Sequence, residues 1–226
     1  SIGIIPTGSQ DPYALRRQAA GIVQILLDRK LSATLSDVFN IAIDVHGTLG
    51  NMKRSADEIR KELHEFFGLR VKKLLSETLR YDVVDAVLAA GYDDVASVVN
   101  RGAALMTAVQ TGEVFKATVE SFNRVGNLAA KAIHKSVNTG EFTEQGEKTL
   151  YEAWCSAYES YSVALQEGDA TRALALASSI TPAVTAFFDS VMVMAEDDAV
   201  RNNRLALLAV IDSELKRFAD FSKLVV

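Results

Sequence analysis

Hydrophobic residues recur along most of the chain at the three- and four-residue spacing of amphipathic helices, and no stretch shows convincing strand-like alternation. The predicted helices cover about 12–29, 36–45, 55–79, 93–110, 112–137, 143–167, 169–180, a segment from 182 and a segment from 197. A further short apolar segment lies at 81–91. We therefore predict an all-α fold of about ten helices in two packed helical bundles.

Two of the three prolines stand where helices are predicted to begin. Asp11-Pro12 and Thr181-Pro182 each place a capping side chain before a proline at the first helical position, where the missing N–H is not needed. Between the two bundles, a seam is predicted near residues 102–112. This seam divides the chain into residues 1–105 and 106–226.

The composition limits the class of protein. With 226 residues, 49% of them hydrophobic, the chain can bury a real core. Its net charge of −5 means that a polyanion must bind a local cationic patch. No run approaches the ~18 apolar residues of a membrane span and no signal peptide is present, so we expect no membrane partner. The single cysteine fits a reducing, cytoplasmic setting. We expect no DNA partner.

The chain begins at Ser1 without a methionine, so we expect a piece of a longer polypeptide. A single cysteine, Cys155, excludes an internal disulfide and a cysteine-based metal cage. Its helical setting beside Trp154 and Tyr158 predicts packing in the core.

Motifs for catalysis are missing from the sequence. His46, His64 and His134 have no partners at metal-ligand or triad spacing, and His64-Glu65 lacks the second histidine of the zinc-protease motif. Neither a P-loop nor a G-x-G-x-x-G run occurs. The run GTLG at 47–50 fits the backbone-clamping loop of a KH domain, but that module needs a sheet, so an interhelical turn is the preferred interpretation. We expect no catalytic residue, metal or cofactor in this chain.

The predicted helix at 112–137 has the most uneven distribution of side chains. One face is mainly apolar. The other carries Lys116, Asn123, Arg124, Asn127, Lys131, His134 and Lys135, interrupted only by Glu120. Cations with amides between them suit phosphate contacts and base-edge hydrogen bonds on single-stranded RNA. A plain solvated helix face would explain the same pattern.

The last predicted helix carries a second candidate. Arg201 lies off its apolar stripe and could contact RNA, whereas Arg204 projects into the middle of the stripe. An arginine there is expected to pair with a carboxylate or with helix-end carbonyls in the core. Asn203 is ambiguous.

Four segments resemble the β subunit of the bacterial two-subunit glycyl-tRNA synthetase. They are DPYALRRQAAGIVQIL at 11–26, RYDVVDAVLA at 80–89, FFDSVMVMAEDDAVRNNRLALL at 187–208 and FADFSKL at 218–224, with a weaker fifth, FNRVGNLAAK, at 122–131. Because that β subunit is much longer, the resemblance implies its C-terminal part. Residues from about 110 onward resemble the DALR-type anticodon-binding domain, with Asp198-Ala199-Val200-Arg201 as its signature and valine in place of leucine.

The resemblance implies a role in ATP-dependent attachment of glycine to tRNA, with the active site and the ATP on the α subunit. The expected partners are glycine tRNA, the α subunit in an α2β2 heterotetramer, and the remainder of the β subunit. A purely structural scaffold without RNA contact is the alternative. The tail of an arginyl-tRNA synthetase would explain the second half of the chain, but not the segments at 11–26 and 80–89.

Overall fold

Capping side chains set the starts of several helices in the computed structural model, which describes residues 11, 13–29, 31–48, 50 and 54–226. Asp11 accepts hydrogen bonds from the N–H groups of Leu15 and Arg16, and Ser55 forms a reciprocal capping box with Glu58. Asp169 and Asp197 cap two later helices in the same way. These bonds satisfy N–H groups that have no partner within the helix.

The described residues divide into two compact units. The first contains the described residues up to Leu79 together with Gly91–Val99, and the second contains Arg80–Ala90 and Asn100–Val226. No strand occurs in the part of the chain that the structure describes. The prediction of an all-α fold in two helical bundles is therefore confirmed.

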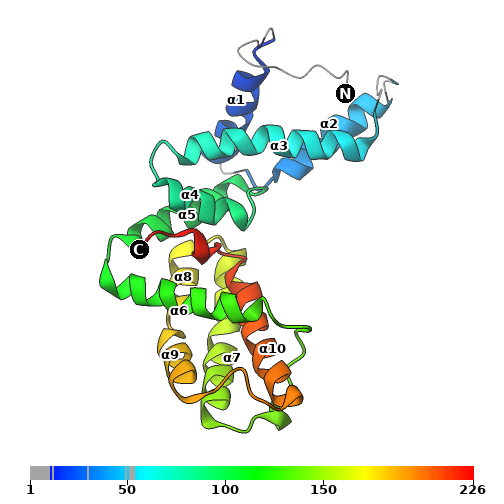
Figure 1. Ribbon diagram of the computed structural model, residues 1–226. Coiled ribbons are helices and arrows are strands. Elements are labelled where there is room, and N and C mark those ends of the chain that lie inside the picture. Colours follow the sequence, from blue (N-terminus) through cyan, green and yellow to red (C-terminus); the bar gives the residue numbers. More distant parts are fainter. Residues whose placement is uncertain (1–10, 12, 30, 49, 51–53) are drawn as a thin grey trace. The chain divides into compact units, whose positions relative to one another are not determined.

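In the first unit, α3 (Ala56–Leu75) packs against both α1 (Leu15–Asp28) and α2 (Leu35–Thr48), as Figure 1 shows. Phe39 and Phe67 meet at the centre of this unit, with their ring centroids 4.9 Å apart. The helix α5 (Val95–Val109) begins in the first unit and ends in the second.

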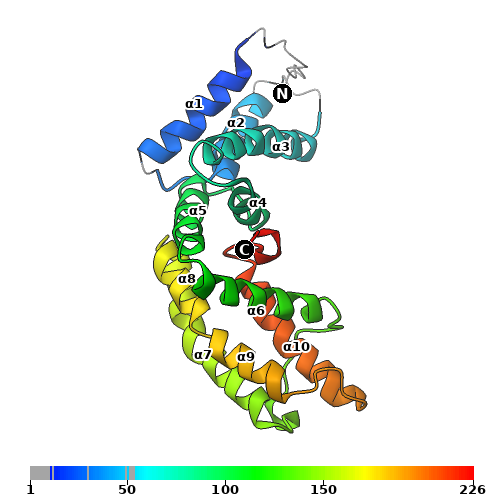
Figure 2. The ribbon, with the colours of Figure 1, turned by 60° about the vertical axis from the view of Figure 1, so that its left-hand side comes forward.

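The second unit is built around a long helix, α7 (Gln145–Gln166), on which α8 (Ala170–Ser178) and α9 (Thr181–Ser190) pack. A further helix, α6 (Glu113–Ala129), lies against α9, α10 (Asp198–Leu215) and the 3-10 turn η2 (Phe221–Lys223) (Figure 2). The turn η1 (Thr139–Glu141) precedes α7.

The helix α4 (Tyr81–Ala89) belongs to the second unit because the end of the chain binds it. The carbonyl of Ala86 accepts a hydrogen bond from the N–H of Asp220, and the carboxylate of Asp82 accepts one from the N–H of Val225. Buried Arg101 donates to the carbonyls of Val87 and Phe218. Apart from the bond to Val87, these contacts join segments more than 100 residues apart. The two units therefore divide the chain differently from the predicted boundary at residue 105.

Two expectations about helix starts need revision. Pro12 lies outside the described residues, and the helix after Asp11 begins at Leu15. Thr181 does not cap α9 but is its first residue, with Ile180 at the N-cap. The hydroxyl of Thr181 instead donates a hydrogen bond to that of Thr118 on α6. Pro182 stands in the first turn, one position later in the helix than predicted.

The prediction that Cys155 packs in the core was wrong, because its side chain is exposed. The buried face of α7 includes Leu150, Trp154 and Tyr161. One residue after Trp154, the helix has turned by about 100°, which directs Cys155 to the solvent.

The stretch Ala170–Ser190 is long and apolar enough to cross a membrane by length and composition alone, with a mean hydropathy of 1.2. In the structure it forms two helices, α8 and α9, that meet near Ile180. Its side chains Leu174, Val184 and Phe187 are buried, and both helices pack on α7. This is the arrangement of a core segment.

Candidate nucleic-acid interface

The helix α6 is anchored by one buried face. Phe115, Val119, Phe122 and Val125 are all at most 5% exposed and pack toward α9 and α10. The four residues predicted from this helix as RNA contacts lie outside this buried face. Arg124 and Asn127 are exposed, and Lys116 and Asn123 are half-buried.

The predicted helix at 112–137 is wrong in its second part, because α6 ends at Ala129. Residues 130–138, here called the 130–138 segment, make a turn and then run without helical structure. Ile133, predicted on the apolar face, is consequently 76% exposed. The exposed positions of Lys131, His134 and Lys135 belong to this segment and not to a helix face.

A tertiary contact accounts for the course of the 130–138 segment. The N–H of Asn138 donates to Oδ1 of Asn203 at 2.8 Å, and Nδ2 of Asn203 donates to the carbonyl of Asn138 at 2.9 Å. Asn203 is only 2% exposed and projects from α10. In place of the last two predicted helical turns, the 130–138 segment brings the backbone of Asn138 to this amide.

Lys131 and Lys135 remain available to a ligand. Within the part of the chain that the structure describes, neither side chain has an ion pair within 4.0 Å or a side-chain hydrogen bond. Figure 1 shows the 130–138 segment leaving the end of α6 and passing beside α10. An exposed cation without an internal partner can bind a phosphate without breaking a native contact.

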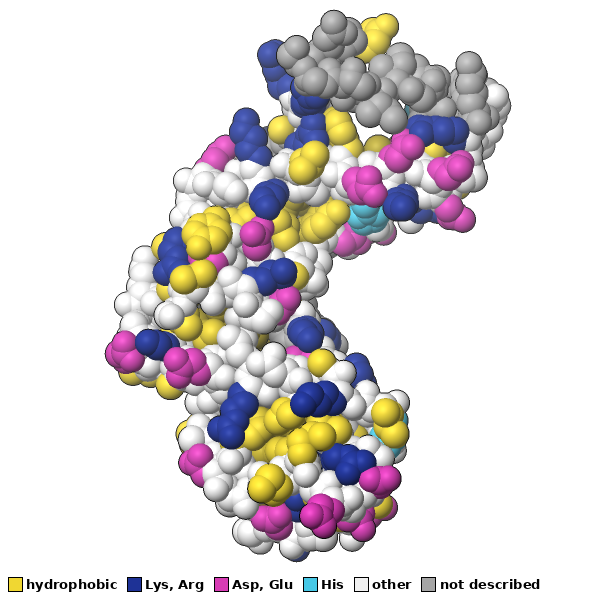
Figure 3. Space-filling view, viewed as in Figure 1, with side chains coloured by type: hydrophobic (Ala, Val, Ile, Leu, Met, Phe, Trp, Pro, Cys, Tyr) yellow, Lys and Arg dark blue, Asp and Glu magenta, His cyan; other side chains and the backbone are white. Residues whose placement is uncertain are grey.

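Arg124 has a different setting. Its guanidinium lies 4.2 Å from the centre of the Phe188 ring on α9, a cation–π arrangement. On this face of the second unit, Figure 3 shows a hydrophobic area with Lys and Arg side chains at its edge. The side chain of Arg124 is nevertheless exposed, so its N–H groups remain open to a ligand.

Asn123 and Asn127 face a hollow between α6, the end of α10 and η2. The hollow has a volume of about 130 Å³. It is lined by Phe122, Asn123, Gly126, Asn127, Asp212, Leu215, Lys216, Ala219, Asp220, Phe221 and Ser222. The structure thus separates the residues of the predicted strip. Asn123 and Asn127 line the hollow, and Arg124 lies against Phe188 of α9. Lys116 is half-buried near the start of α6, and Lys131 and Lys135 lie beyond its end.

Arg201 makes contacts around the start of its own helix. Its guanidinium donates to the carbonyl of Ala195 at 2.9 Å and pairs with the carboxylate of Asp198. These contacts hold it against the segment before α10, and its side chain is 27% exposed. As an RNA contact, Arg201 stays a prediction.

Arg204 is paired in the core, as predicted. It is 3% exposed and donates to the carbonyl of Met192, the hydroxyl of Thr143 and the carboxylate of Glu144. Its Nε also lies 3.2 Å from an oxygen of Glu147, which is fully buried. Burial raises the pKa of Glu147, but hydrogen bonds from Arg204 and from two backbone N–H groups outweigh this and lower the pKa below its ordinary value.

The structure brings Ser36, His64 and Asp93 together in the first unit, which the sequence did not predict. The hydroxyl of Ser36 lies 3.1 Å from Nε2 of His64 and donates to Asp93 at 2.9 Å. In a catalytic triad the carboxylate holds the other ring nitrogen. Here Asp93 approaches the same nitrogen, at 3.9 Å, so this cluster is a structural contact that joins α2, α3 and the segment before α5.

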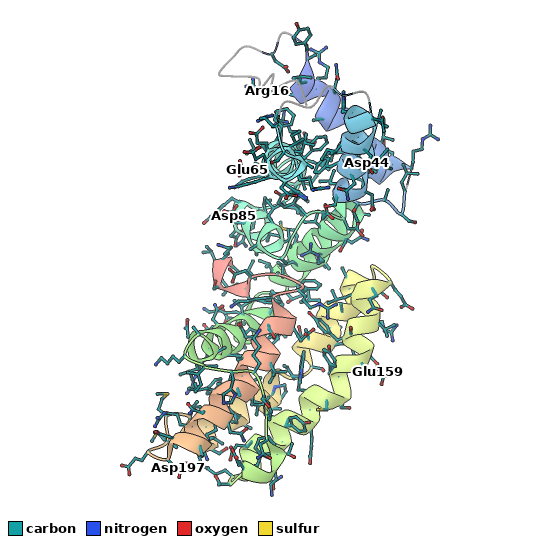
Figure 4. All side chains as sticks on the ribbon, turned by 90° about the vertical axis from the view of Figure 1, so that its right-hand side faces the viewer. Arg16, Asp44, Glu65, Asp85, Glu159 and Asp197 are labelled. Carbon is teal, nitrogen blue, oxygen red and sulfur yellow. The ribbon has the colours of Figure 1, made fainter. Side chains whose placement is uncertain are left out.

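Metal and backbone-clamping sites also find no support. Among the described residues, no group of three or more histidine, cysteine or acidic side chains is placed to hold a metal ion. Figure 4 shows Asp85, Glu159 and Asp197 projecting from separate places in the second unit. Of the GTLG run, Gly47 and Thr48 end α2, and Leu49 lies outside the described residues, as does the nearby Lys53.

In comparisons with known proteins, each half of the chain matches the model of a protein family. Residues 1–89 match the model of the glycyl-tRNA synthetase beta subunit, and residues 118–220 match that of the DALR anticodon binding domain. Similar proteins, each named glycine–tRNA ligase beta subunit, occur in Halalkalibacterium halodurans and Desulforamulus reducens at 40% identity and in Shouchella clausii at 41%. These matches cover 99% or 100% of this chain.

The chain belongs to the glycyl-tRNA synthetase β-subunit family. It spans about a third of the length of these relatives, 32% or 33%. The region that matches the DALR domain begins within α6 and ends just before η2, so it contains the Asn203 clamp, the 130–138 segment and most of the hollow. The family predicted from the sequence is confirmed.

Sequence reasoning missed the hollow and the function of Asn203. An asparagine within the apolar stripe of a helix was the available signal, because a buried amide must find partners. Its partner, the backbone of Asn138, carries no sequence signature. The hollow likewise combines residues about 90 positions apart, such as Asn127 and Lys216.

Proposed function

We propose that this chain is the tRNA-binding portion of a glycyl-tRNA synthetase β subunit and contacts the anticodon arm through α6 and the 130–138 segment. The observation that carries the proposal is the coincidence of two findings. The DALR anticodon-binding match covers residues 118–220, and within it Lys131 and Lys135 are exposed without internal ion pairs. The surface beside them carries Asn123, Arg124 and Asn127.

The proposed role is positional. The chain holds one end of the tRNA so that the acceptor end reaches an active site on the α subunit, where ATP and glycine react. In this proposal the chain itself carries no cofactor and works in the cytoplasm as part of an α2β2 assembly with the α subunit and the rest of the β subunit. What supports it is the name of the relatives, each a glycine–tRNA ligase beta subunit.

The test is the affinity of the chain for glycine tRNA, measured by fluorescence anisotropy over a range of salt concentrations. Changing Lys131 and Lys135 together to alanine should weaken binding to all tRNA sequences about equally. The plot of log affinity against log salt should become less steep by about 1 to 2. Each phosphate contact that the variant no longer makes removes the release of about one counterion on binding.

The matched control changes Lys61 and Lys73, two exposed lysines of α3 in the first unit, to alanine. It makes the same change in net charge but leaves the proposed surface intact. Equal losses in the two double variants would show that only net charge matters. Unchanged binding after loss of Lys131 and Lys135 would contradict the proposed surface.

A scaffold function is favoured for the first unit by a separate observation. Ile41 and Val45, one turn apart on α2, are 67% and 53% exposed, and Ile25 on α1 is 56% exposed. The two side chains of α2 lie on one face of the helix, where they could join an apolar contact surface with another part of the β subunit. In the full-length β subunit, amide hydrogen exchange of α2 should be slower than in this chain alone. Equal exchange rates would exclude docking through α2.

A further inference from the structure

The hollow beside α6 has an acceptor-rich lining. Oδ1 of Asn123 is buried and has no hydrogen-bond partner. The carboxylates of Asp212 and Asp220 line the same space, and Lys216 pairs with Asp212 at 2.7 Å. Two carboxylates disfavour a phosphate in this position, whereas a neutral ligand with N–H groups would find acceptors there.

An unpaired buried acceptor is costly and needs an explanation. Asn123 stands one helical turn before Asn127, so both amides lie on the same side of α6. The end of an asparagine side chain turns easily about its last torsion. Such a turn would direct the buried oxygen of Asn123 to a donor that enters the hollow.

The shape of the hollow also depends on a glycine. A Cβ atom on Gly126 would lie 3.0 Å from Oδ1 of Asp212, closer than ordinary van der Waals contact. Glycine is a poor helix former, yet Gly126 lies inside α6. Its missing side chain lets Asp212 approach the helix and keeps the hollow open between Asn123 and Asn127.

Phe122 and Phe221 supply the apolar part of the lining, with their ring centroids 5.0 Å apart. A flat ligand with a polar edge would therefore meet apolar walls and acceptors together. The volume of about 130 Å³ is comparable with that of one nucleobase. Single-stranded RNA presents such ligands when its bases leave the stack.

We propose that this hollow takes one unstacked base of the bound RNA, and that it selects a base with an exocyclic amino group. The amine donates to Oδ1 of Asn123, while Lys131 and Lys135 hold the backbone outside. This inference rests on the proposed function, since it names the part of the RNA that the same surface reads.

The test uses the whole chain and glycine tRNA transcripts in which each amine-bearing base of the anticodon loop is replaced by uracil, one at a time. One replacement should weaken binding to the unaltered chain by roughly tenfold, the effect of losing a base-edge hydrogen-bond pair. In the variant Asn123→Ala, this discrimination should disappear.

Gly126→Ala provides a second variant. Alanine is the better helix former, but its Cβ would press on Oδ1 of Asp212, so the denaturation midpoint is measured first to show that the variant is folded. It narrows the hollow and should also abolish the discrimination. Asn100→Ala is the matched control: Asn100 is an exposed asparagine of the same unit, outside the hollow, and its variant should keep the discrimination in full.

The outcomes separate the two proposals. If the chain binds tRNA in a salt-dependent way but Asn123→Ala keeps the discrimination, the hollow proposal is overturned and the proposed function stands. The same holds if no replacement by uracil matters. If the unaltered chain fails to bind glycine tRNA, both proposals fall. Amide hydrogen exchange of the full-length β subunit without RNA gives a further outcome. If exchange around Asn123 is slower there than in this chain alone, the hollow belongs to a protein contact and the inference is overturned.

Discussion

At the scale of single residues, the second unit depends on a buried ion pair. Glu147 accepts hydrogen bonds from the N–H groups of Thr143 and Glu144 at the start of α7, and Arg204 of α10 approaches it from the other side. A buried charge is stable only when its partners are complete. The pair therefore links the start of α7 to α10.

Changing Arg204 to alanine should lower the free energy of unfolding by about 3–5 kcal/mol, because it leaves the Glu147 carboxylate buried without its cation. Urea denaturation monitored by circular dichroism would measure this. Arg217→Ala is the matched control. Arg217 pairs with Glu214 at 2.7 Å but is 42% exposed, so its loss should cost about 1 kcal/mol or less. Similar costs for the two variants would show that the buried pair contributes little.

The lowered pKa of Glu147 gives this pair a defined pH dependence. In the unfolded chain a glutamate takes up its proton near pH 4.3, before the folded protein does. The stabilisation is therefore complete above that pH and is lost as the pH falls through the lower pKa of the folded state. Glu147→Gln should lose less stability between about pH 5 and pH 3 than the unaltered chain.

At the scale of elements, backbone conformation fixes where α6 begins. Gly112 precedes the helix with φ +66° and ψ −127°, a conformation that residues with a side chain rarely adopt. A Cβ atom there would meet nothing within 4 Å, so only backbone strain opposes a larger residue. Gly21 in α1 has equally open surroundings but an ordinary helical backbone.

The same substitution should therefore act in opposite directions at these two glycines. Gly112→Ala should destabilise the second unit by about 1–3 kcal/mol through backbone strain. Gly21→Ala should stabilise α1 by about 1 kcal/mol, since alanine is the better helix former. Denaturation midpoints of the two variants would measure both effects. A stabilising Gly112→Ala would mean that the start of α6 adopts another conformation in solution.

At the scale of the whole molecule, the two units have different proposed tasks. The first presents apolar side chains for contact with the rest of the β subunit, and the second presents exposed cations and a hollow for RNA. A ligand that binds one folded unit stabilises that unit by mass action.

Hydrogen exchange with and without glycine tRNA should therefore show slowed exchange in α6 and the 130–138 segment and unchanged exchange in α1 and α2. At a free tRNA concentration of 100 times Kd, the second unit should gain about 2.7 kcal/mol. Slowed exchange confined to α1 and α2 would reverse the proposed assignment of tasks. The variant with Lys131 and Lys135 changed to alanine should show less slowing of exchange in α6 and the 130–138 segment at the same tRNA concentration.

The sequence alone determined the helical class, the approximate position of most helices and the family, because these depend on local periodicity and on the identity of residues. It also placed Arg204 in the core, since an arginine inside an apolar stripe must find a partner. Only the tertiary structure decided where α6 ends, that α4 joins the second unit, and that Asn123 and Asn127 face a hollow. These features come from contacts between residues such as Asn138 and Asn203, 65 positions apart, and local periodicity carries no record of such distant partners.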